Sequence, residues 1–304
     1  MNAVMNSNAF SLVKIAEDIS VELGFNIVRL GSRPGRYRNC IVVAMPDYAT
    51  LNLSKVNNQI CENSILYITT EGPLVKYIVP TMDAIYRDWP VIAHSQYVCE
   101  KLVDSGFRCD GYDYPVPRRV IKENARPKIN GGSIVGYLAG YMLRKYPSWA
   151  WEMESDILLY TSPNNPFLRK WRAYSTSVYN STDYEVMGFY SFIDVYASLS
   201  TSEGVGMTPY EAALFGAVPI IADIPAFEPL RDAALFVEAD GPKWFERHAY
   251  EVIEHYYWKP RDMDYMIDYV LEIESTERFE IISDVYKAIE GMGEKYSNIR
   301  RYLV

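Results

Sequence analysis

The chain has 304 residues, enough for two domains of ordinary size, and 49% of them are hydrophobic, so a sizeable core is available. Its formal net charge of −9 at pH 7 argues against nucleic acid as the main partner. No signal peptide opens the sequence and no apolar run reaches membrane-spanning length, so we expect a cytoplasmic protein.

The cysteines show neither a Cys-x-x-Cys spacing nor a metal-binding pattern. They are Cys40, Cys61, Cys99 and Cys109. We therefore expect free thiols in a reducing cytoplasm, and the alternative is an oxidised pair in a thermophile. Scarce glutamine, which occurs only at Gln59 and Gln96, also points to a hot habitat.

The first part of the chain alternates between helical and strand-like segments. Residues 8–23 carry apolar side chains at helical spacing, and Gly24 ends this helix. Short apolar strands follow in the segments NIVRL, CIVVAM, SILYITT and PVIAHS, and QYVCEKLVDSG is the helix after the last of them. Such alternation implies a parallel sheet with helices on its faces.

A basic segment rich in proline and glycine, residues 114–132, reads as a linker. The alternation then resumes with SIVGYLAG, SDILLYT, TSVY, IDVYASLS and VPIIAD, and from about residue 242 the pattern is mostly helical. We predict an N-terminal Rossmann-like domain over residues 1–120 and a C-terminal one over 121–285. A terminal helix in 286–304 is expected to pack back on the N-terminal domain.

The most informative stretch is STSEGVGMTPYEAALFGAVPIIAD, residues 200–223. Thr208 is suited to cap a helix, Glu211 falls where a capping-box glutamate belongs, and Gly216 ends the helix. Before the helix lies a loop in which Glu203 and two glycines face the free N–H groups of the first turn, a natural anion site. The alternative is structural, with Glu211 only a cap and Glu203 an ordinary loop carboxylate.

The longer segment IDVYASLSTSEGVGMTPYEAALFGAVPIIADIPAFEPL closely resembles the donor-binding segment of retaining glycosyltransferases with the GT-B fold. The hallmark of that family is a glutamate, seven intervening residues and a second glutamate, within a pattern such as EGFGLPPLEAMACGTPVI. The matching positions are Glu203, Gly204, Gly206, Glu211, Ala212, Gly216, Pro219 and Ile220. The resemblance covers roughly residues 90–235 and is specific near 194–228.

The resemblance implies an α/β GT-B fold, with two Rossmann-like domains whose parallel sheets face a central cleft. The N-terminal domain is expected to be shortened, because the family's first strand and glycine-rich loop are barely present in MNAVMNSNAF. The implied activity is retaining hexosyl transfer from a nucleotide-diphosphate sugar to a glycan, lipid or protein acceptor. No cofactor and no metal are implied, and no Asp-x-Asp motif follows a strand. The alternatives are a nucleotide-sugar epimerase of the same architecture and a non-catalytic sugar-nucleotide-binding protein.

The resemblance also suggests roles for single residues. Glu203 would hold the donor sugar, Glu211 the ribose, and Arg144 with Lys145 the leaving diphosphate. For this basic pair the alternative is a solvated surface. The further donor-binding candidates are Gly136, Tyr179, Gly204, Val205, Gly206, Met207 and Thr208.

Candidates for the acceptor side lie where N-terminal strands end, and they are Asn8, Glu71 and His94. For His94 the alternative is a structural histidine. Two basic clusters, within residues 29–38 and 118–128, are either solvated surface or a peripheral contact with an anionic membrane leaflet on its cytoplasmic face. The sequence leaves the sugar, the base, the acceptor and the oligomeric state open.

Overall fold

The computed structural model describes residues 2–6, 10–29, 35–47, 50–52, 54, 61–115, 134–241 and 243–303. The chain divides into two compact units. Unit 1 comprises Met1–Pro115, Phe245–Glu254 and Gly293–Val304, and unit 2 comprises Val116–Trp244 and His255–Met292. Most of the predicted linker, residues 116–133, lies outside the described ranges.

Unit 1 contains a six-stranded parallel sheet in the order β2-β1-β3-β4-β5-β6. The strands are β1 (Asn2–Asn6), β2 (Asn26–Arg29), β3 (Tyr37–Ala44), β4 (Cys61–Ile68), β5 (Val91–Ala93) and β6 (Gly111–Tyr112). The prediction of a barely present first strand is wrong, because β1 pairs with β2 on one side and with β3 on the other. Its residues Ala3, Val4 and Met5 are fully buried, so this apolar run stabilises the middle of the sheet.

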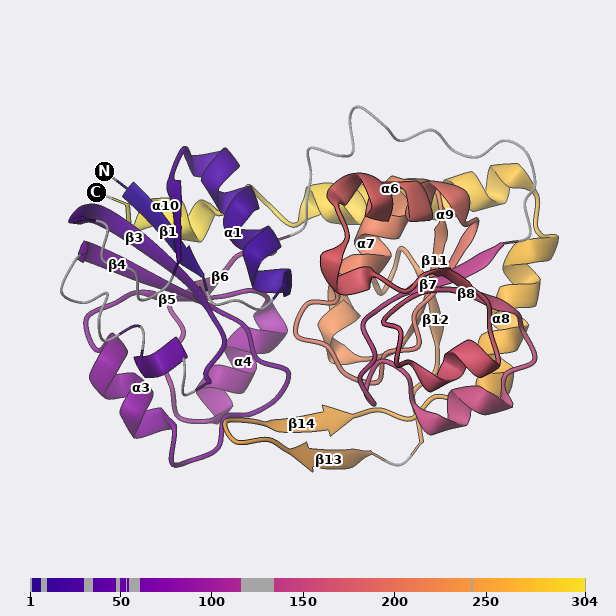
Figure 1. Cartoon of the computed structure of the whole chain (residues 1–304), viewed down its shortest axis with the longest axis horizontal. Coiled ribbons are helices and arrows are strands. Elements are labelled where there is room, and N and C mark those ends of the chain that lie inside the picture. Colours follow the sequence, from indigo (N-terminus) through magenta and orange to yellow (C-terminus); the bar gives the residue numbers. More distant parts are fainter. Residues whose placement is uncertain are drawn as a thin grey trace. The chain divides into compact units, whose positions relative to one another are not determined.

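Helices cover both faces of this sheet. They are α1 (Phe10–Leu23), α3 (Val79–Tyr86), α4 (Gln96–Asp104) and the C-terminal α10 (Ser297–Arg301). Figure 1 shows α1 and α10 on one face and α3 and α4 on the other. Helix α1 ends at Gly24, which adopts a φ of 68°, as the sequence predicts. Asp113 accepts hydrogen bonds from the backbone N–H groups of Asn298 and Ile299, and it therefore caps α10.

Unit 2 contains a second six-stranded parallel sheet, in the order β12-β11-β10-β7-β8-β9. Its strands are β7 (Val135–Leu138), β8 (Ile157–Tyr160), β9 (Ala173–Ser175), β10 (Val195–Ala197), β11 (Val218–Ala222) and β12 (Leu235–Val237). Four of them were predicted from their apolar runs. The predicted strand TSVY is wrong, because Val178–Asn180 forms the short 3-10 helix η3 and the preceding segment supplies β9.

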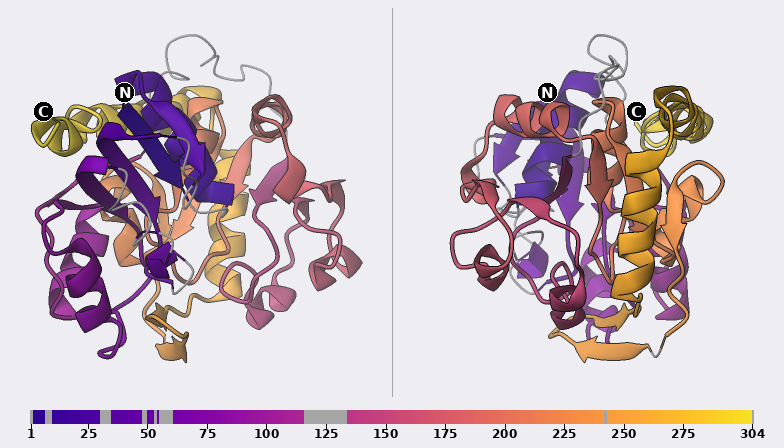
Figure 2. Two further views of the ribbon diagram at one scale, coloured as in Figure 1. Left: turned by 60° about the vertical axis from the view of Figure 1, so that its left-hand side comes forward. Right: turned by 90° about the vertical axis from the view of Figure 1, so that its right-hand side faces the viewer.

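The α-helices described in unit 2 pack around this second sheet. They are α6 (Asp183–Phe192), α7 (Met207–Leu214), α8 (Pro260–Glu272) and α9 (Ser275–Gly291). The right-hand view of Figure 2 shows α8 running alongside the strands of the second sheet, and it contacts β10, β11 and β12. The expectation of a mostly helical C-terminal region holds from α8 onward. It fails before α8, where β13 (Trp244–Arg247) and β14 (Val252–His255) pair with each other.

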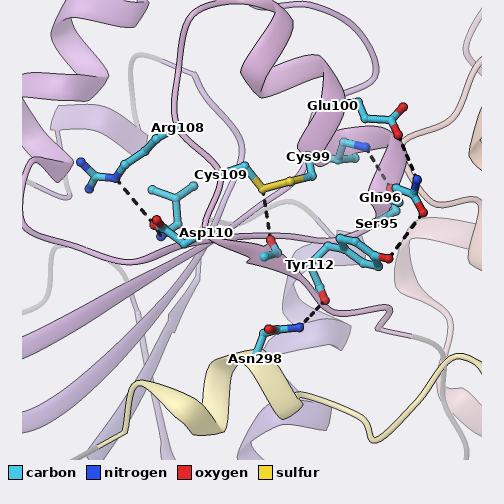
Figure 3. The surroundings of a disulfide bond; sticks show 12 residues. Ser95, Gln96, Cys99, Glu100, Arg108, Cys109, Asp110, Tyr112 and Asn298 are labelled. Atoms are coloured by element: carbon cyan, nitrogen blue, oxygen red, sulfur yellow. Dashed lines mark hydrogen bonds and ion pairs between the residues drawn. A yellow bond between two sulfur atoms is a disulfide. The ribbon is translucent and has the colours of Figure 1, made fainter.

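The expectation of free thiols is wrong, because the four cysteines form two disulfides, Cys40–Cys61 and Cys99–Cys109. The first joins the neighbouring strands β3 and β4. The second joins α4 to the segment before β6, as Figure 3 shows. Spacing along the sequence is informative for metal sites, but these pairs depend on which elements are neighbours in the fold, which a single sequence does not reveal. Among the helices in the described ranges, none combines the length and the apolar character needed to cross a membrane.

Candidate functional site

The strand order of unit 2 creates a switch point between β7 and β10. From β7 the sheet continues to β8 and β9, whereas from β10 it continues the other way to β11 and β12. Ligands of open α/β sheets bind outside the carboxyl ends of the strands at such a point. The loops leaving these two strands, residues 139–147 and 198–206, carry six of the eleven catalytic and donor-binding candidates that the sequence singles out.

A charged pair lies at the switch point. Lys145 of the first loop donates to Oε1 of Glu203 in the second loop, and Ser200 Oγ donates to the same oxygen over 2.6 Å. The side chains of Lys145 and Glu203 are 18% and 10% exposed. The pair is therefore largely withdrawn from water, where the interaction between charges is stronger than at an exposed surface. The structure thus brings together two of the three residues predicted to be catalytic.

The third of these residues, Arg144, precedes Lys145 in the same loop. Its guanidinium lies 2.7 Å from the Met142 sulfur, measured from Nη1. Its carbonyl accepts a hydrogen bond from the backbone N–H of Thr201 over 2.8 Å. This backbone contact joins the two loops, so the position of Lys145 depends on that of the loop carrying Glu203.

The start of α7 differs from the capping box that the sequence predicts. The helix begins at Met207, and its N-cap is Gly206, which has a φ of 63° and a ψ of 61°. Thr208 therefore lies inside the first turn and is not the cap. A Cβ on Gly206 would lie 2.2 Å from the Phe227 ring, so a glycine is needed here for space as well as for its left-handed backbone. The helix start therefore has no side-chain cap, and its first N–H groups lie at the positive end of the helix dipole.

Glu211 is held by a tyrosine and not by the helix start. Tyr190, on α6, donates its hydroxyl to Glu211 Oε2 over 2.9 Å. Burial, and after it the negative charge of Glu211, raises the pKa of Tyr190 well above its usual value, so the hydroxyl remains a donor. Because α7 begins at Met207, Glu211 does not stand at the capping-box position that the sequence predicts, and its role in binding a donor stays a prediction.

A layer of tyrosines packs beneath the two loops. The ring of Tyr137 lies 5.2 Å from that of Tyr146 and 5.8 Å from that of Tyr196, and Tyr190 packs 6.0 Å from Tyr196. Tyr146 donates to the Ala139 carbonyl and Tyr196 to the Leu138 carbonyl, at 3.0 and 3.3 Å. These aromatic contacts and hydrogen bonds fix the backbone where β7 gives way to its loop.

The other donor-side candidates occupy different surroundings. Gly136 is in the middle of β7, and a Cβ there would lie 2.5 Å from Ile193, so its small size serves packing. A Cβ on Gly140 would lie 2.2 Å from the hydroxyl oxygen of Tyr179, so these two residues are in close contact. Tyr179 itself is 50% exposed. Gly204, Val205 and Met207 lie in the loop or in the first turn of α7. Sequence reasoning missed Ser200, Thr201 and Tyr190, and only Ser200 carried a signal, its place three residues before Glu203.

The acceptor-side candidates lie in unit 1. His94 is 1% exposed, and its ring centroid lies 4.1 Å from that of Tyr67. Burial lowers the pKa of His94 to about 3, so it is neutral at ordinary pH. The backbone N–H of Glu71 donates to the buried carboxylate of Glu251 over 2.7 Å. His94 therefore has the surroundings of a structural histidine, whereas the acceptor-side role of the Glu71 side chain stays a prediction. Asn8 lies outside the described residues.

In the described ranges, no three His, Cys, Asp or Glu side chains gather in a way that could hold a metal ion. Metal independence stays a prediction. The basic cluster within residues 118–128 and Arg33 lie outside those ranges, while Arg36 and Arg38 are exposed. The predicted membrane contact also stays a prediction.

Comparison with solved structures supports the fold. A variant of S. aureus TarM, in complex with fondaparinux, alpha-GlcNAc-glycerol and UDP, matches with a TM-score of 0.62 and 14% identity, over 87% of this chain and 54% of that one. The pneumococcal O-GlcNAc transferase GtfA, in complex with UDP and GlcNAc, matches at 0.54 and 11%, over 84% and 53%. A UDP-forming alpha,alpha-trehalose-phosphate synthase from Burkholderia vietnamiensis matches at 0.52 and 10%, over 93% and 73%.

These likenesses show the fold alone, since all three identities are low. The chain has the α/β fold of GT-B glycosyltransferases, with two parallel six-stranded sheets, as the sequence predicts. It spans about half the length of the TarM structures that it matches. No family model matches the chain, and no curated protein matches it.

Proposed function

We propose that this chain is a retaining glycosyltransferase that takes its sugar from a nucleotide-diphosphate donor bound in unit 2. The observation that carries the proposal is the Lys145–Glu203 pair, beside the glycine-capped start of α7 at the switch point between β7 and β10. A cation, a carboxylate and a helix N-terminus together provide groups for a diphosphate and for sugar hydroxyls.

The donor would be held at three places. Its diphosphate would bind the N–H groups at the start of α7, with Lys145 and Arg144 balancing the charge. Glu203 would accept hydrogen bonds from hydroxyls of the sugar, and Glu211, oriented by Tyr190, from the ribose. The UDP in the TarM and GtfA complexes supports a uridine nucleotide as the first donor to test.

The site has to stabilise the negative charge that develops on the leaving diphosphate. Lys145 already lies within reach of Glu203, so an incoming phosphate would compete for the same ammonium group. Binding therefore converts an internal ion pair into a contact with the donor, and the freed carboxylate takes the sugar hydroxyls. We propose that this handles the charge without a metal ion. Full activity in a chelator would support the claim, and activity that needs added magnesium or manganese would contradict it.

The proposed stereochemistry is retention. Double displacement needs a nucleophilic carboxylate beneath the anomeric carbon. Because Glu203 and Glu211 are assigned to hydroxyls, we propose attack on the face from which the diphosphate leaves, with a phosphate oxygen taking the acceptor's proton. An α-linked donor should then give an α-linked first product, which proton NMR detects. A β-linked product would contradict the proposal.

Donor turnover tests the function itself. The intact protein is incubated with UDP-glucose or UDP-GlcNAc, first without an acceptor and then with a panel of glycan, lipid and peptide acceptors. We expect slow release of UDP with water as acceptor and faster release with the right acceptor. Conversion of the donor to its epimer would favour an epimerase. Tight binding with no turnover under any condition would favour a non-catalytic binding protein.

A further inference from the structure

The base of the β13–β14 hairpin holds a histidine for which the proposed chemistry has no role. His255 ends β14 and is 1% exposed. Its ring stacks on the indole of Trp244 at the start of β13, with centroids 4.7 Å apart and planes 6° from parallel. Both residues belong to unit 2, although the hairpin residues between them belong to unit 1.

His255 is joined to the candidate site through Thr201. Its Nδ1 lies 2.9 Å from Thr201 Oγ1, and the backbone N–H of Tyr256 donates to the Thr201 carbonyl over 2.9 Å. Thr201 in turn donates twice to the Arg144 carbonyl, from its N–H over 2.8 Å and from its hydroxyl over 3.1 Å. Thr201 is fully buried, so water does not compete for these contacts.

The direction of these hydrogen bonds determines where the histidine proton lies. A threonine hydroxyl has one hydrogen, and toward the Arg144 carbonyl, which can only accept, that hydrogen must be donated. Thr201 Oγ1 therefore accepts from its other neighbour. Both contacts of Thr201 Oγ1 are hydrogen bonds at once only if the His255 nitrogen carries a hydrogen, which is the tautomer with the proton on Nδ1.

We propose that His255, protonated at Nδ1, is a positioning residue that sets the separation of Lys145 and Glu203 through Thr201. Lys145 directly follows the residue whose carbonyl Thr201 binds, and Glu203 lies two residues after Thr201. The histidine thus restrains the point where the loops after β7 and β10 meet. The kinetic consequence rests on the proposed function, whereas the proton position and the loop restraint do not.

The aromatic residues around the hairpin base make His255 a firm support. Trp149 packs 5.0 Å from Trp244 and 5.0 Å from Tyr257, measured between ring centroids. A Cβ on Gly241 would lie 2.1 Å from the Tyr257 ring, so the backbone and this ring are in close contact. A side chain held in this way loses little further freedom when it restrains a loop.

The proton position is tested by nitrogen-15 NMR of the ligand-free protein with labelled histidine. The chain has three histidines, and the signals of His255 are those lost in His255→Asn. We expect the chemical shifts of a ring protonated at Nδ1. A ring protonated only at Nε2 would overturn the proposal.

Loop restraint is tested by amide hydrogen exchange of the ligand-free protein. His255→Phe keeps a flat ring against Trp244 but lacks the donor, whereas the amide nitrogen of His255→Asn can stand near the place of Nδ1. We expect exchange in residues 139–147 and 198–206 to become at least about tenfold faster in His255→Phe and to be largely restored in His255→Asn. Equal exchange in the two variants would overturn the proposal. His248→Phe, at a histidine outside the site, is the control.

Kinetics then test the effect on the site. Thr201→Val keeps the shape of the side chain and removes the hydroxyl, and Thr201→Ser keeps the hydroxyl. Because misplaced catalytic groups slow chemistry more than they weaken binding, we expect Thr201→Val to lower kcat by about tenfold or more, with UDP affinity changed less than about threefold. Thr201→Ser should recover most of the loss. An unchanged kcat in Thr201→Val would overturn the positioning role. A wild-type protein without transfer activity would refute the proposed function, and the two ligand-free tests would still decide the rest.

Discussion

The two units have parallel six-stranded sheets, but polar groups at the carboxyl ends of their strands have different surroundings. In unit 1, Glu251 accepts hydrogen bonds from Thr70 and from the Glu71 backbone, and His94 is buried and neutral. In unit 2, Lys145 and Glu203 pair beside a helix start that lacks a side-chain cap. The sheets alone therefore do not make a site, and the loops after the strands decide where one forms.

Reduction of the disulfides should produce the largest effect and should affect unit 1 alone. Both bonds lie in unit 1, and they join cysteines 21 and 10 residues apart. Loops of this length predict a loss of about 3 kcal/mol of unfolding free energy for each bond.

Hydrogen exchange in a reductant provides the measurement. Residues 61–115 should exchange faster after reduction, while 134–241 should stay unchanged. The double variant Cys40→Ser/Cys61→Ser should reproduce part of the effect without a reductant. Complete reduction, checked by thiol titration, with no change in unit 1 would contradict the disulfide assignment.

Glu203→Gln should have the largest effect on activity. It removes the charge that pairs with Lys145 and would weaken the proposed contact with the sugar, so we expect turnover to fall about a hundredfold, or about 3 kcal/mol. Glu228→Gln is the matched control, since Glu228 is an exposed partner of Arg231 in the same unit. A near-normal rate in a folded Glu203→Gln protein would remove Glu203 from the site.

The cost of replacing a left-handed glycine by alanine can be compared between the two units. Gly206 and Gly24 have φ values of 63° and 68°, but a Cβ on Gly206 meets the Phe227 ring whereas a Cβ on Gly24 meets nothing within 4 Å. Gly24→Ala should cost about 1 kcal/mol of unfolding free energy, from backbone strain alone. Gly206→Ala adds a steric clash and should cost about 3 kcal/mol. Urea unfolding measures both, and equal costs would show that Gly206 is not tightly packed.

His94 should make stability depend on pH. Its folded pKa of about 3 lies below the ordinary value near 6.5, so the unfolded chain binds more protons between these pH values. The unfolding free energy should therefore fall as pH decreases through this window. Between pH 7 and pH 5 the wild type should lose about 2 kcal/mol more than His94→Asn.

Urea unfolding of both proteins at the two pH values isolates this contribution, because the other titrating groups are common to both. Equal losses in wild type and His94→Asn would mean that folding does not lower the pKa of His94.

Much of the fold was predictable from local signals. The strands β7, β8, β10 and β11 were predicted because apolar runs rich in β-branched residues mark buried parallel strands. The strand β9 was missed because Ala173–Ser175 is short and mostly exposed. The two disulfides were missed because they depend on which elements are neighbours. The expected role of Thr208 as a cap was wrong because the left-handed Gly206 starts the helix earlier.

In the candidate site too, local sequence signals were readable, whereas contacts between distant segments were not. The two glutamates and Lys145 could be proposed from the sequence because they stand in one motif or come after a strand. The partners that orient them were not, since Tyr190 and His255 come from other helices and strands and meet the site only after folding. A sequence therefore indicates the groups that would touch a ligand more readily than the groups that hold them in place.

The exchange footprint of UDP on the intact protein, in the presence of a chelator, tests whether unit 2 holds a nucleotide-diphosphate site. We expect protection concentrated in residues 139–147 and 198–211, where the loops after β7 and β10 and the start of α7 lie. GDP and ADP serve as comparison ligands for the base. Protection confined to unit 1, or no protection by any of the three nucleotides at saturating concentration, would contradict the claim.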